Sequence, residues 1–172
     1  MQVCKKVPGA FFLRSGMETL TFKDVGPNDH AALFRLFAAV RAEELGMGGW
    51  DAGLRDQILR LQFDAQRRGY ADRFPGADER MILRDGVPIG WLIVDRTGTR
   101  LHGIDIGLLA EERRQGIGTQ IIRALQEEAA GDGRPMTLTV KRQNVRAMAL
   151  YVRLGFLTVS EDDVHLVMEW RR

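Results

Sequence analysis

Residues 104–122 read IDIGLLAEERRQGIGTQII, and this stretch decides the expected fold. It opens as an apolar strand, passes through a charged turn and continues as an amphipathic helix that begins near Gly116. The helix prediction depends on apolar residues at helical spacing, Ile117, Ile121, Leu125 and Ala129, which would all face the core. The stretch therefore predicts a strand–turn–helix unit.

The start of this helix is a candidate phosphate-binding site. A helix N-terminus presents unpaired N–H groups and a partial positive charge. Gly116 and Gly118 carry no Cβ, so a phosphate can approach those N–H groups closely. Arg113 and Arg114 lie just outside the helix and could add charge-assisted contacts. The alternative is an ordinary glycine-containing turn before a surface helix.

Spacing separates the classes of protein that use such a phosphate cradle. A dinucleotide-binding fingerprint requires a third glycine where this chain has Ile121, and a P-loop requires a lysine after Gly118. The pattern that is present, Arg113-x-x-Gly116-x-Gly118, resembles the Q/R-x-x-G-x-G/A motif of the GNAT-type N-acetyltransferases. In that family the loop holds the pyrophosphate of acetyl-CoA. The resemblance implies cofactor contacts from Arg113, Arg114, Gln115, Gly116, Ile117, Gly118 and Thr119.

A second motif follows the first. The pattern Asn144-x-x-Ala147-x-x-x-Tyr151-x-x-x-Gly155-Phe156 resembles the second signature of the GNAT family. Asn144 and Tyr151 are two helical turns apart, so they share one helix face about 10 Å apart along the axis. The family implies contacts from Asn144 and Ala147 to the pantetheine arm and places Tyr151 near the sulfur. The alternative is that Tyr151 packs in the core and Asn144 only caps its helix.

Tyr151 and Asp105 are the candidate catalytic residues. Acetyl transfer to an amine leaves a thiolate, and a phenol with an ordinary pKa near 10 can protonate it at neutral pH. The attacking amine must itself lose a proton. Asp105 is the candidate base because it lies opposite in phase to Ile104 and Ile106 and leaves their apolar face. A structural hydrogen bond or salt bridge is an equal alternative for Asp105.

Backbone groups complete the expected site. The family implies that the main chain of Ile106, Gly107 and Leu108, continuing to Leu109, pairs with the pantetheine amides. This arrangement requires the fourth and fifth strands to diverge after Leu108, and Gly107 would suit a β-bulge there.

The other elements follow from periodicity and turn signals. Strands are expected at residues 20–25, 80–84, 88–95, 136–141, 156–159 and 164–170, with a hairpin turn at Asp85-Gly86. A first helix contains Leu33, Phe37 and Val40, and a second, capped by Asp51, has a core face of Leu54, Ile58, Leu61 and Ala65. The order β-α-α-β-β-β-α-β-α-β-β is the GNAT order. We therefore expect a mixed α/β fold with a mostly antiparallel central sheet flanked by helices.

Composition excludes several classes of protein. The 172 residues are 45% apolar and 28% charged with a formal net charge of +2, and no basic stripe indicates nucleic acid. No apolar run has transmembrane length. The single cysteine excludes an intramolecular disulfide, and no Cys/His spacing indicates a metal. We expect a cytoplasmic protein, with residues 1–16 as a flexible extension and residues 17–172 as a single acetyltransferase domain.

The function that these features predict is N-acetylation. Acetyl-CoA would be attacked directly, in a ternary complex, by a primary amine of a small molecule or peptide. Trp50, Phe63 and Tyr70 could wall a compact acceptor pocket, which favours a small molecule. Glu43 and Glu44 could steer a cationic amine, although helix-end glutamates are usually only solvated. The alternative is a catalytically silent acyl-CoA-binding module. No nucleic acid, membrane or metal partner is expected, and a homodimer is left open.

Overall fold

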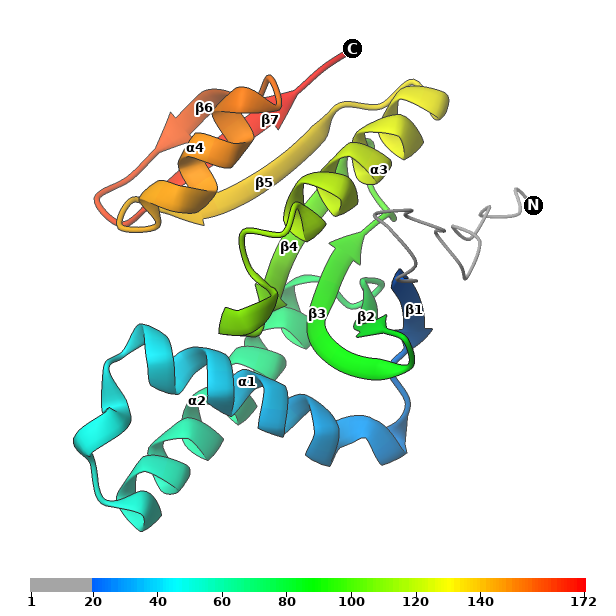
Figure 1. Cartoon of the computed structure of the whole chain (residues 1–172). Helices are drawn as coiled ribbons and strands as arrows, with labels where there is room; N and C mark the ends of the chain where they lie inside the picture. Colours follow the sequence, from blue (N-terminus) through cyan, green and yellow to red (C-terminus); the bar gives the residue numbers. More distant parts are fainter. Residues whose placement is uncertain (1–19) are drawn as a thin grey trace.

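In the part of the chain that the structure describes, seven strands form one sheet in the order β1-β2-β3-β4-β5-β7-β6 (Figure 1). The structure is a computed structural model that describes residues 20–172, so the predicted extension at residues 1–16 lies outside the described residues. The strands are β1 (Leu20–Asp24), β2 (Asp78–Arg84), β3 (Val87–Asp95), β4 (Leu101–Leu108), β5 (Met136–Lys141), β6 (Leu157–Glu161) and β7 (His165–Trp170). Only β4 and β5 pair in parallel. The predicted order of helices and strands along the chain and the parallel crossover are confirmed.

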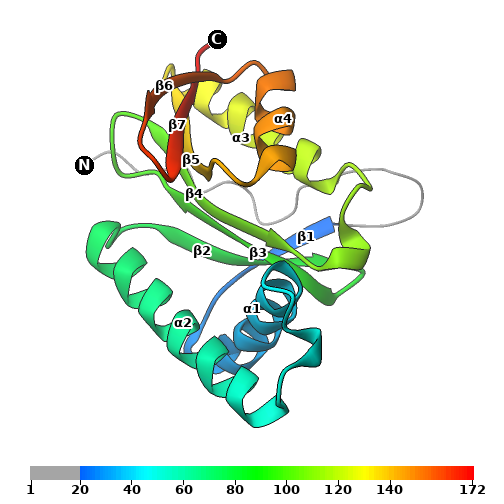
Figure 2. The same ribbon diagram turned by 90° about the vertical axis from the view of Figure 1, so that its left-hand side faces the viewer.

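Two pairs of helices cover opposite faces of the sheet (Figures 1 and 2). The pair α1 (His30–Glu44) and α2 (Ala52–Arg73) covers one face, and α3 (Ile117–Gly131) and α4 (Val145–Arg153) cover the other. In the part of the chain that the structure describes, no helix combines the length and apolar character needed to cross a membrane. Because the two helix pairs lie on opposite faces, each face of the sheet has its own hydrophobic core.

The core under α3 and α4 follows the predicted periodicity. Ile117, Ile121, Leu125 and Ala129 are all buried there, each no more than 4% exposed. Gly155 has the positive φ of 85° that ends α4, and the hairpin turn has positive φ at both Asp85 (49°) and Gly86 (81°). These turns form as predicted because glycine, and less readily aspartate, tolerates the left-handed region.

The core under α1 and α2 corrects the predicted buried face of α2. Of the predicted face only Ile58 packs against this core, whereas Leu54 and Leu61 are 50% and 69% exposed and Ala65 is exposed. Leu59 and Phe63 are buried instead. Phe63 makes ring contacts with Phe34 and Phe37 of α1, with centroids 5.6 and 5.2 Å apart. A buried aromatic side chain removes more apolar area from water than a leucine side chain, and edge-on contact between rings adds to the stabilisation. The aromatic contacts therefore decide which side of α2 faces the sheet.

The strands β4 and β5 separate earlier than predicted. Their pairing ends at Gly103 and Leu138, although β4 continues to Leu108, and Figure 2 shows the two halves of the sheet opening into a V. The expected bulge at residue 107 lies instead at Ile104, which has no partner on β3 because Ile93 pairs with Asp105 and Val94 with Gly103.

The extra residue changes the orientation of the side chains along β4. Ile104 packs in the core under α1 and α2, and Ile106 packs in the core under α3 and α4. The predicted common face of these two isoleucines is therefore wrong, since one inserted residue shifts the alternation of a strand. Asp105 still lies on the face opposite Ile106, directed towards α1 and α2.

Candidate active site

A cleft of about 450 Å³ lies where β4 and β5 separate. Its walls come from α1, α2, β3 and β4 on one side and from α3, β5, α4 and β7 on the other. Asp105 of β4 lines it, together with Asn144 and Tyr151, which are the N-cap and an inner residue of α4. The cleft thus brings together the two predicted catalytic residues and the second sequence motif.

The loop before α3 leaves its backbone donors free. The first hydrogen bond of the helix runs from Gln120 N–H to Gly116 O (3.0 Å), and no described residue accepts from the N–H groups of Ile117, Gly118 and Thr119. Gly116 caps the helix with a φ of 83°. A Cβ on Gly118 would make only an ordinary contact, 3.7 Å from Leu150 Cδ2. The helix N-terminus is therefore open to an anionic group, as such termini are in phosphate sites.

The three polar side chains of this loop point in different directions. Arg113 turns back into the protein, where Nε donates to Leu108 O (2.9 Å) and Nη1 pairs with Glu43 (2.9 Å). Gln115 accepts a hydrogen bond from Arg84 (2.9 Å) and donates to the Glu111 carbonyl (2.6 Å). Arg114, with a φ of 64°, contacts no polar or charged side chain among residues 20–172. Arg113 thus braces the loop, and Arg114 is the cation left available beside the helix terminus.

Beyond Gly103 one edge of β4 has no strand partner in the described chain. Leu109 N–H bonds to Ile89 O of β3 (3.0 Å), and backbone groups alternate in direction along a strand, so the groups of Ile106 and Leu108 point to the open edge. Gly107 has a different role, because a Cβ there would collide with the Trp91 indole. The open edge therefore offers the backbone groups of Ile106 and the N–H of Leu108, whose carbonyl already accepts from Arg113.

Asn144 both caps α4 and lines the cleft. Its Oδ1 accepts from the Ala147 N–H (3.1 Å), which confirms the predicted helix cap. The amide nitrogen of Asn144 donates to no described residue, and the residue lines the cleft wall. Ala147 packs against the core under α3 and α4. Capping orients the Asn144 side chain and leaves its donor for a ligand.

Tyr151 combines the two interpretations that the sequence left open. The residue is 8% exposed, and its ring lies 5.8 Å from that of Phe156. Its hydroxyl makes no hydrogen bond to residues 20–172, although the residue lines the cleft. Burial, and secondly the charge of Asp105, raise the pKa of Tyr151 to about 12. The ring therefore packs in the core, while the phenol stays protonated at the cleft surface.

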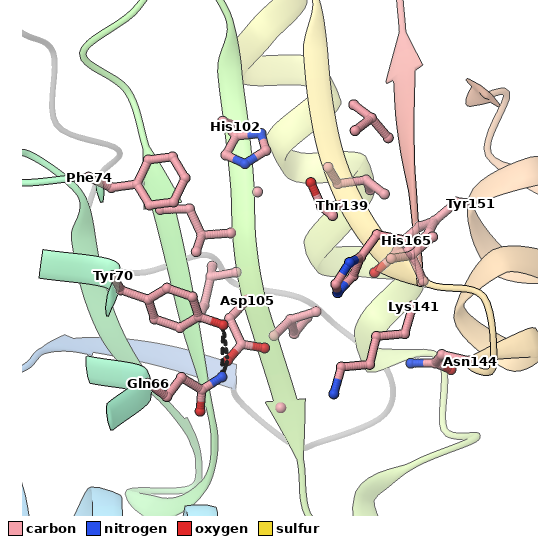
Figure 3. A pocket seen from close by; sticks show the side chains of 18 of the residues that line it. Gln66, Tyr70, Phe74, His102, Asp105, Thr139, Lys141, Asn144, Tyr151 and His165 are labelled. Carbon is pink, nitrogen blue, oxygen red and sulfur yellow. Dashed lines mark hydrogen bonds between the residues drawn. The ribbon is translucent and has the colours of Figure 1, made fainter. Parts of the chain in front are cut away.

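Asp105 is held by three neutral donors at one oxygen. Its Oδ2 accepts from Trp91 Nε1 (3.1 Å), Gln66 Nε2 (3.2 Å) and the Tyr70 hydroxyl (3.4 Å). Gln66 also donates to the Tyr70 oxygen at 2.8 Å. Figure 3 shows Gln66 and Tyr70 reaching Asp105 from α2, across the gap from Tyr151. The other carboxylate oxygen, Oδ1, is left without a donor among the described residues.

This environment changes the acidity of Asp105. Burial raises its pKa, and the Trp91 hydrogen bond, Arg41 and the Tyr70 hydroxyl oppose that change without cancelling it. Arg41 is itself paired with Glu44 (2.6 Å), so it compensates the carboxylate only in part. Burial, together with the Asp105 charge, raises the pKa of Tyr70 to about 12. A buried carboxylate without a full counter-ion is a better proton acceptor than an exposed one.

The structure also decides which acceptor-side residues reach the cleft. Tyr70 lines it, whereas Phe63 is a core residue and Trp50, 47% exposed, is not part of the cleft wall. The expected aromatic wall is therefore mostly absent. The sequence analysis did not identify Gln66 and Trp91 as site residues. For Gln66 the available signal was its helical spacing with Tyr70, and for Trp91 the sequence offered none. Among residues 20–172, no group of three His, Cys, Asp or Glu side chains is placed to hold a metal ion.

Comparisons with known proteins agree with this fold. A model of the Acetyltransferase (GNAT) family matches residues 49–156. The uncharacterized N-acetyltransferase YobR of Bacillus subtilis (strain 168) is 43% identical over 61 residues, which are 34% of this chain and 25% of that protein. The crystal structure of PaiA N-acetyltransferase from Thermoplasma acidophilum in complex with coenzyme A has a TM-score of 0.68 at 14% identity, covering 90% of this chain and 99% of that one. The crystal structure of nourseothricin acetyltransferase has a TM-score of 0.50 at 26% identity, covering 56% of this chain and 66% of that one.

The fold is that of the acetyltransferases of known structure. The family model covers more than half of the chain, so the chain belongs to the Acetyltransferase (GNAT) family. The sequence match to YobR spans only a quarter of that relative's length.

Proposed function

We propose that this chain is an N-acetyltransferase that transfers the acetyl group of acetyl-CoA to a primary amine by direct attack. In the overall reaction the amine nitrogen forms a bond to the acetyl carbon and the carbon–sulfur bond breaks. Of the two protons lost from the starting ammonium group, one goes to a base and then to solvent, and one is gained by the departing sulfur. Acetyl-CoA supplies the activated acetyl thioester, and the chain supplies binding, orientation and proton transfer.

The residues of the cleft and of the loop before α3 fit this co-substrate. The free N–H groups of Ile117, Gly118 and Thr119, with Arg114 beside them, would hold the pyrophosphate. The open edge of β4 at Ile106 and Leu108 would pair with the pantetheine amides. The free amide nitrogen of Asn144 would add a donor from α4. Arg113 would act indirectly, because its guanidinium fastens the loop to Leu108 and Glu43.

Asp105 and Tyr151 take complementary roles in the proposal. Oδ1 of Asp105 would accept a proton from the acceptor ammonium, directly or through water, while the three donors keep Oδ2 in place. The Tyr151 phenol would give its proton to the departing sulfur. A pKa of about 12 keeps Tyr151 protonated, and burial raises the pKa of Asp105 towards the range useful for a base.

One observation carries the proposal, namely that a carboxylate and an unpaired phenol line the same gap between β4 and β5. Acetyl-CoA at 100 times its Kd should stabilise the fold by about 2.7 kcal/mol, which corresponds to about 5–10 °C in Tm. Release of free thiol from acetyl-CoA in the presence of an amine panel then tests transfer. Stabilisation without thiol release would favour the catalytically silent acyl-CoA-binding module. The packing of the Tyr151 ring against Phe156 in the core supports that alternative. A shift with NAD or ATP but none with acetyl-CoA would contradict both.

A further inference from the structure

Arg73, the last residue of α2, lines the cleft with an oriented guanidinium group. Its Nε donates to the Gly69 carbonyl at 3.0 Å. Its guanidinium carbon lies 5.9 Å from the ring centres of both Tyr70 and Phe74. Cation–π attraction and stacking favour this placement. The side chain is therefore fixed through Nε and its flat face, and the two terminal nitrogens remain for another group.

Arg73 has no anionic partner among residues 20–172, whereas two other arginines of α2 do. Arg60 pairs with Asp56 at 2.7 Å, and Arg67 pairs with Glu79 of β2. Within residues 20–172, the guanidinium of Arg73 donates only to a neutral backbone carbonyl. A guanidinium fork with free terminal nitrogens matches the two oxygens of a carboxylate.

Tyr70 connects Arg73 to Asp105. The Tyr70 ring carries the Arg73 guanidinium, and the Tyr70 hydroxyl lies 3.4 Å from Asp105 Oδ2. A free cation and an incompletely compensated carboxylate thus lie at the two ends of one tyrosine side chain, along one wall of the cleft. The spacing of Gln66, Tyr70 and Arg73 at helical intervals places all three on the cleft side of α2. This wall of the cleft therefore carries the positive charge of Arg73 and the negative charge of Asp105 at a separation set by Tyr70.

The opposite wall carries a second cation. Figure 3 shows Lys141 of β5 projecting into the gap, and its ammonium group forms no ion pair with residues 20–172. The nearby acids are already engaged, since Glu161 pairs with Arg142 (2.7 Å) and Asp162 accepts from the Val164 and His165 N–H groups. An acceptor with several positive charges would therefore meet two uncompensated cations in this cleft.

From this arrangement we propose that the acceptor is an amine that also carries a carboxylate, separated from it by a short carbon chain. The ammonium end lies at Asp105, and the carboxylate lies against Arg73. This inference rests on the proposed acetyl transfer and names its substrate class. Simple alkylamines leave Arg73 without a partner, and diamines place a positive charge beside it.

The test compares acceptors that differ only at the far end. An ω-amino acid series from 3-aminopropanoate to 6-aminohexanoate is assayed by thiol release, each against the alkylamine and the diamine of equal length. We expect kcat/KM for the best amino acid to exceed that of its alkylamine by about tenfold to a hundredfold, as one charge-assisted bidentate contact provides. In Arg73→Gln that ratio should fall to about 3 or less, mainly through KM, with an unchanged Tm.

Arg68→Gln is the matched control, because Arg68 is an exposed arginine of the same helix that does not line the cleft. This variant should keep the wild-type preference. Equal or better turnover of alkylamines, or an unchanged preference in Arg73→Gln, would overturn the carboxylate site while leaving acetyl transfer in place. Acetyl-CoA binding without turnover of any ω-amino acid would also overturn it. Failure to bind acetyl-CoA at all would remove the proposed function and the inference with it.

Discussion

Replacement of Tyr151 by phenylalanine separates its two roles. The variant keeps the ring, and therefore keeps the contact with Phe156 at 5.8 Å and the burial within the core. The lost hydroxyl makes no hydrogen bond with the described residues, so no partner is left unsatisfied by its removal. We expect the free energy of unfolding to change by less than about 1 kcal/mol, which corresponds to less than about 4 °C in Tm.

The expected effect on the rate is much larger. A positioned general acid contributes about 10² to 10⁴ in rate, and a thiol with an ordinary pKa near 8.5 needs less help than a poorer leaving group. With the pKa of Tyr151 raised to about 12, the phenol is always in its acidic form but is a weak donor. These considerations place the loss in kcat near the lower end, about 10²-fold. The Kd for acetyl-CoA should stay within about threefold.

Thiol-release kinetics, calorimetric acetyl-CoA binding and thermal unfolding on one preparation measure these three quantities. Tyr70→Phe is a matched comparison, because it removes the weakest of the bonds to Asp105 (3.4 Å) while Trp91 and Gln66 remain. We expect less than about a fivefold loss in kcat for that variant. Wild-type kcat in Tyr151→Phe, or a large loss of stability with normal turnover, would refute the assignment and leave Tyr151 as a core residue.

Three further predictions concern other parts of the molecule. Gly118→Ala should leave Tm unchanged, because its Cβ would lie 3.7 Å from Leu150 Cδ2, whereas Gly118→Val should weaken acetyl-CoA binding at least about tenfold; an unchanged Kd would make Gly118 an ordinary turn residue. Asp105→Asn should lower kcat/KM about 10²-fold and gain stability relative to the wild type as pH rises. The reason is that burial raises the folded-state pKa of Asp105, so its contribution to stability is present at low pH and is lost as the carboxyl ionises; parallel unfolding curves from pH 4 to 8 would contradict this. Leu59→Ala should lower the free energy of unfolding by about 2–5 kcal/mol, because Leu59 is only 2% exposed, and Leu61→Ala should lower it by less than about 0.5 kcal/mol, because Leu61 is 69% exposed. The reverse result in urea unfolding would show that the predicted face of α2 is the buried one.

The sequence alone determined the order of the elements and the family. The signals involved are local, because Asp85-Gly86, Gly116 and Gly155 sit at turns that require positive φ. The periodic face of α3 could be read directly because its apolar residues all meet one core. The two motifs identified the GNAT family before any contact was known, and the family match confirms that identification.

The tertiary structure decided which chemistry those elements bring together. Gln66, Tyr70 and Trp91 reach Asp105 across 39, 35 and 14 residues of chain, and no local spacing signals such a meeting. The bulge at Ile104 and the separation of β4 from β5 after Gly103 depend on the register against neighbouring strands. The aromatic contacts of Phe63 with α1 likewise selected the buried face of α2 over its leucine stripe. Periodicity and turn chemistry act within a few residues and fix the elements, whereas register, packing and the pKa of a buried carboxylate depend on partners that only the folded chain supplies.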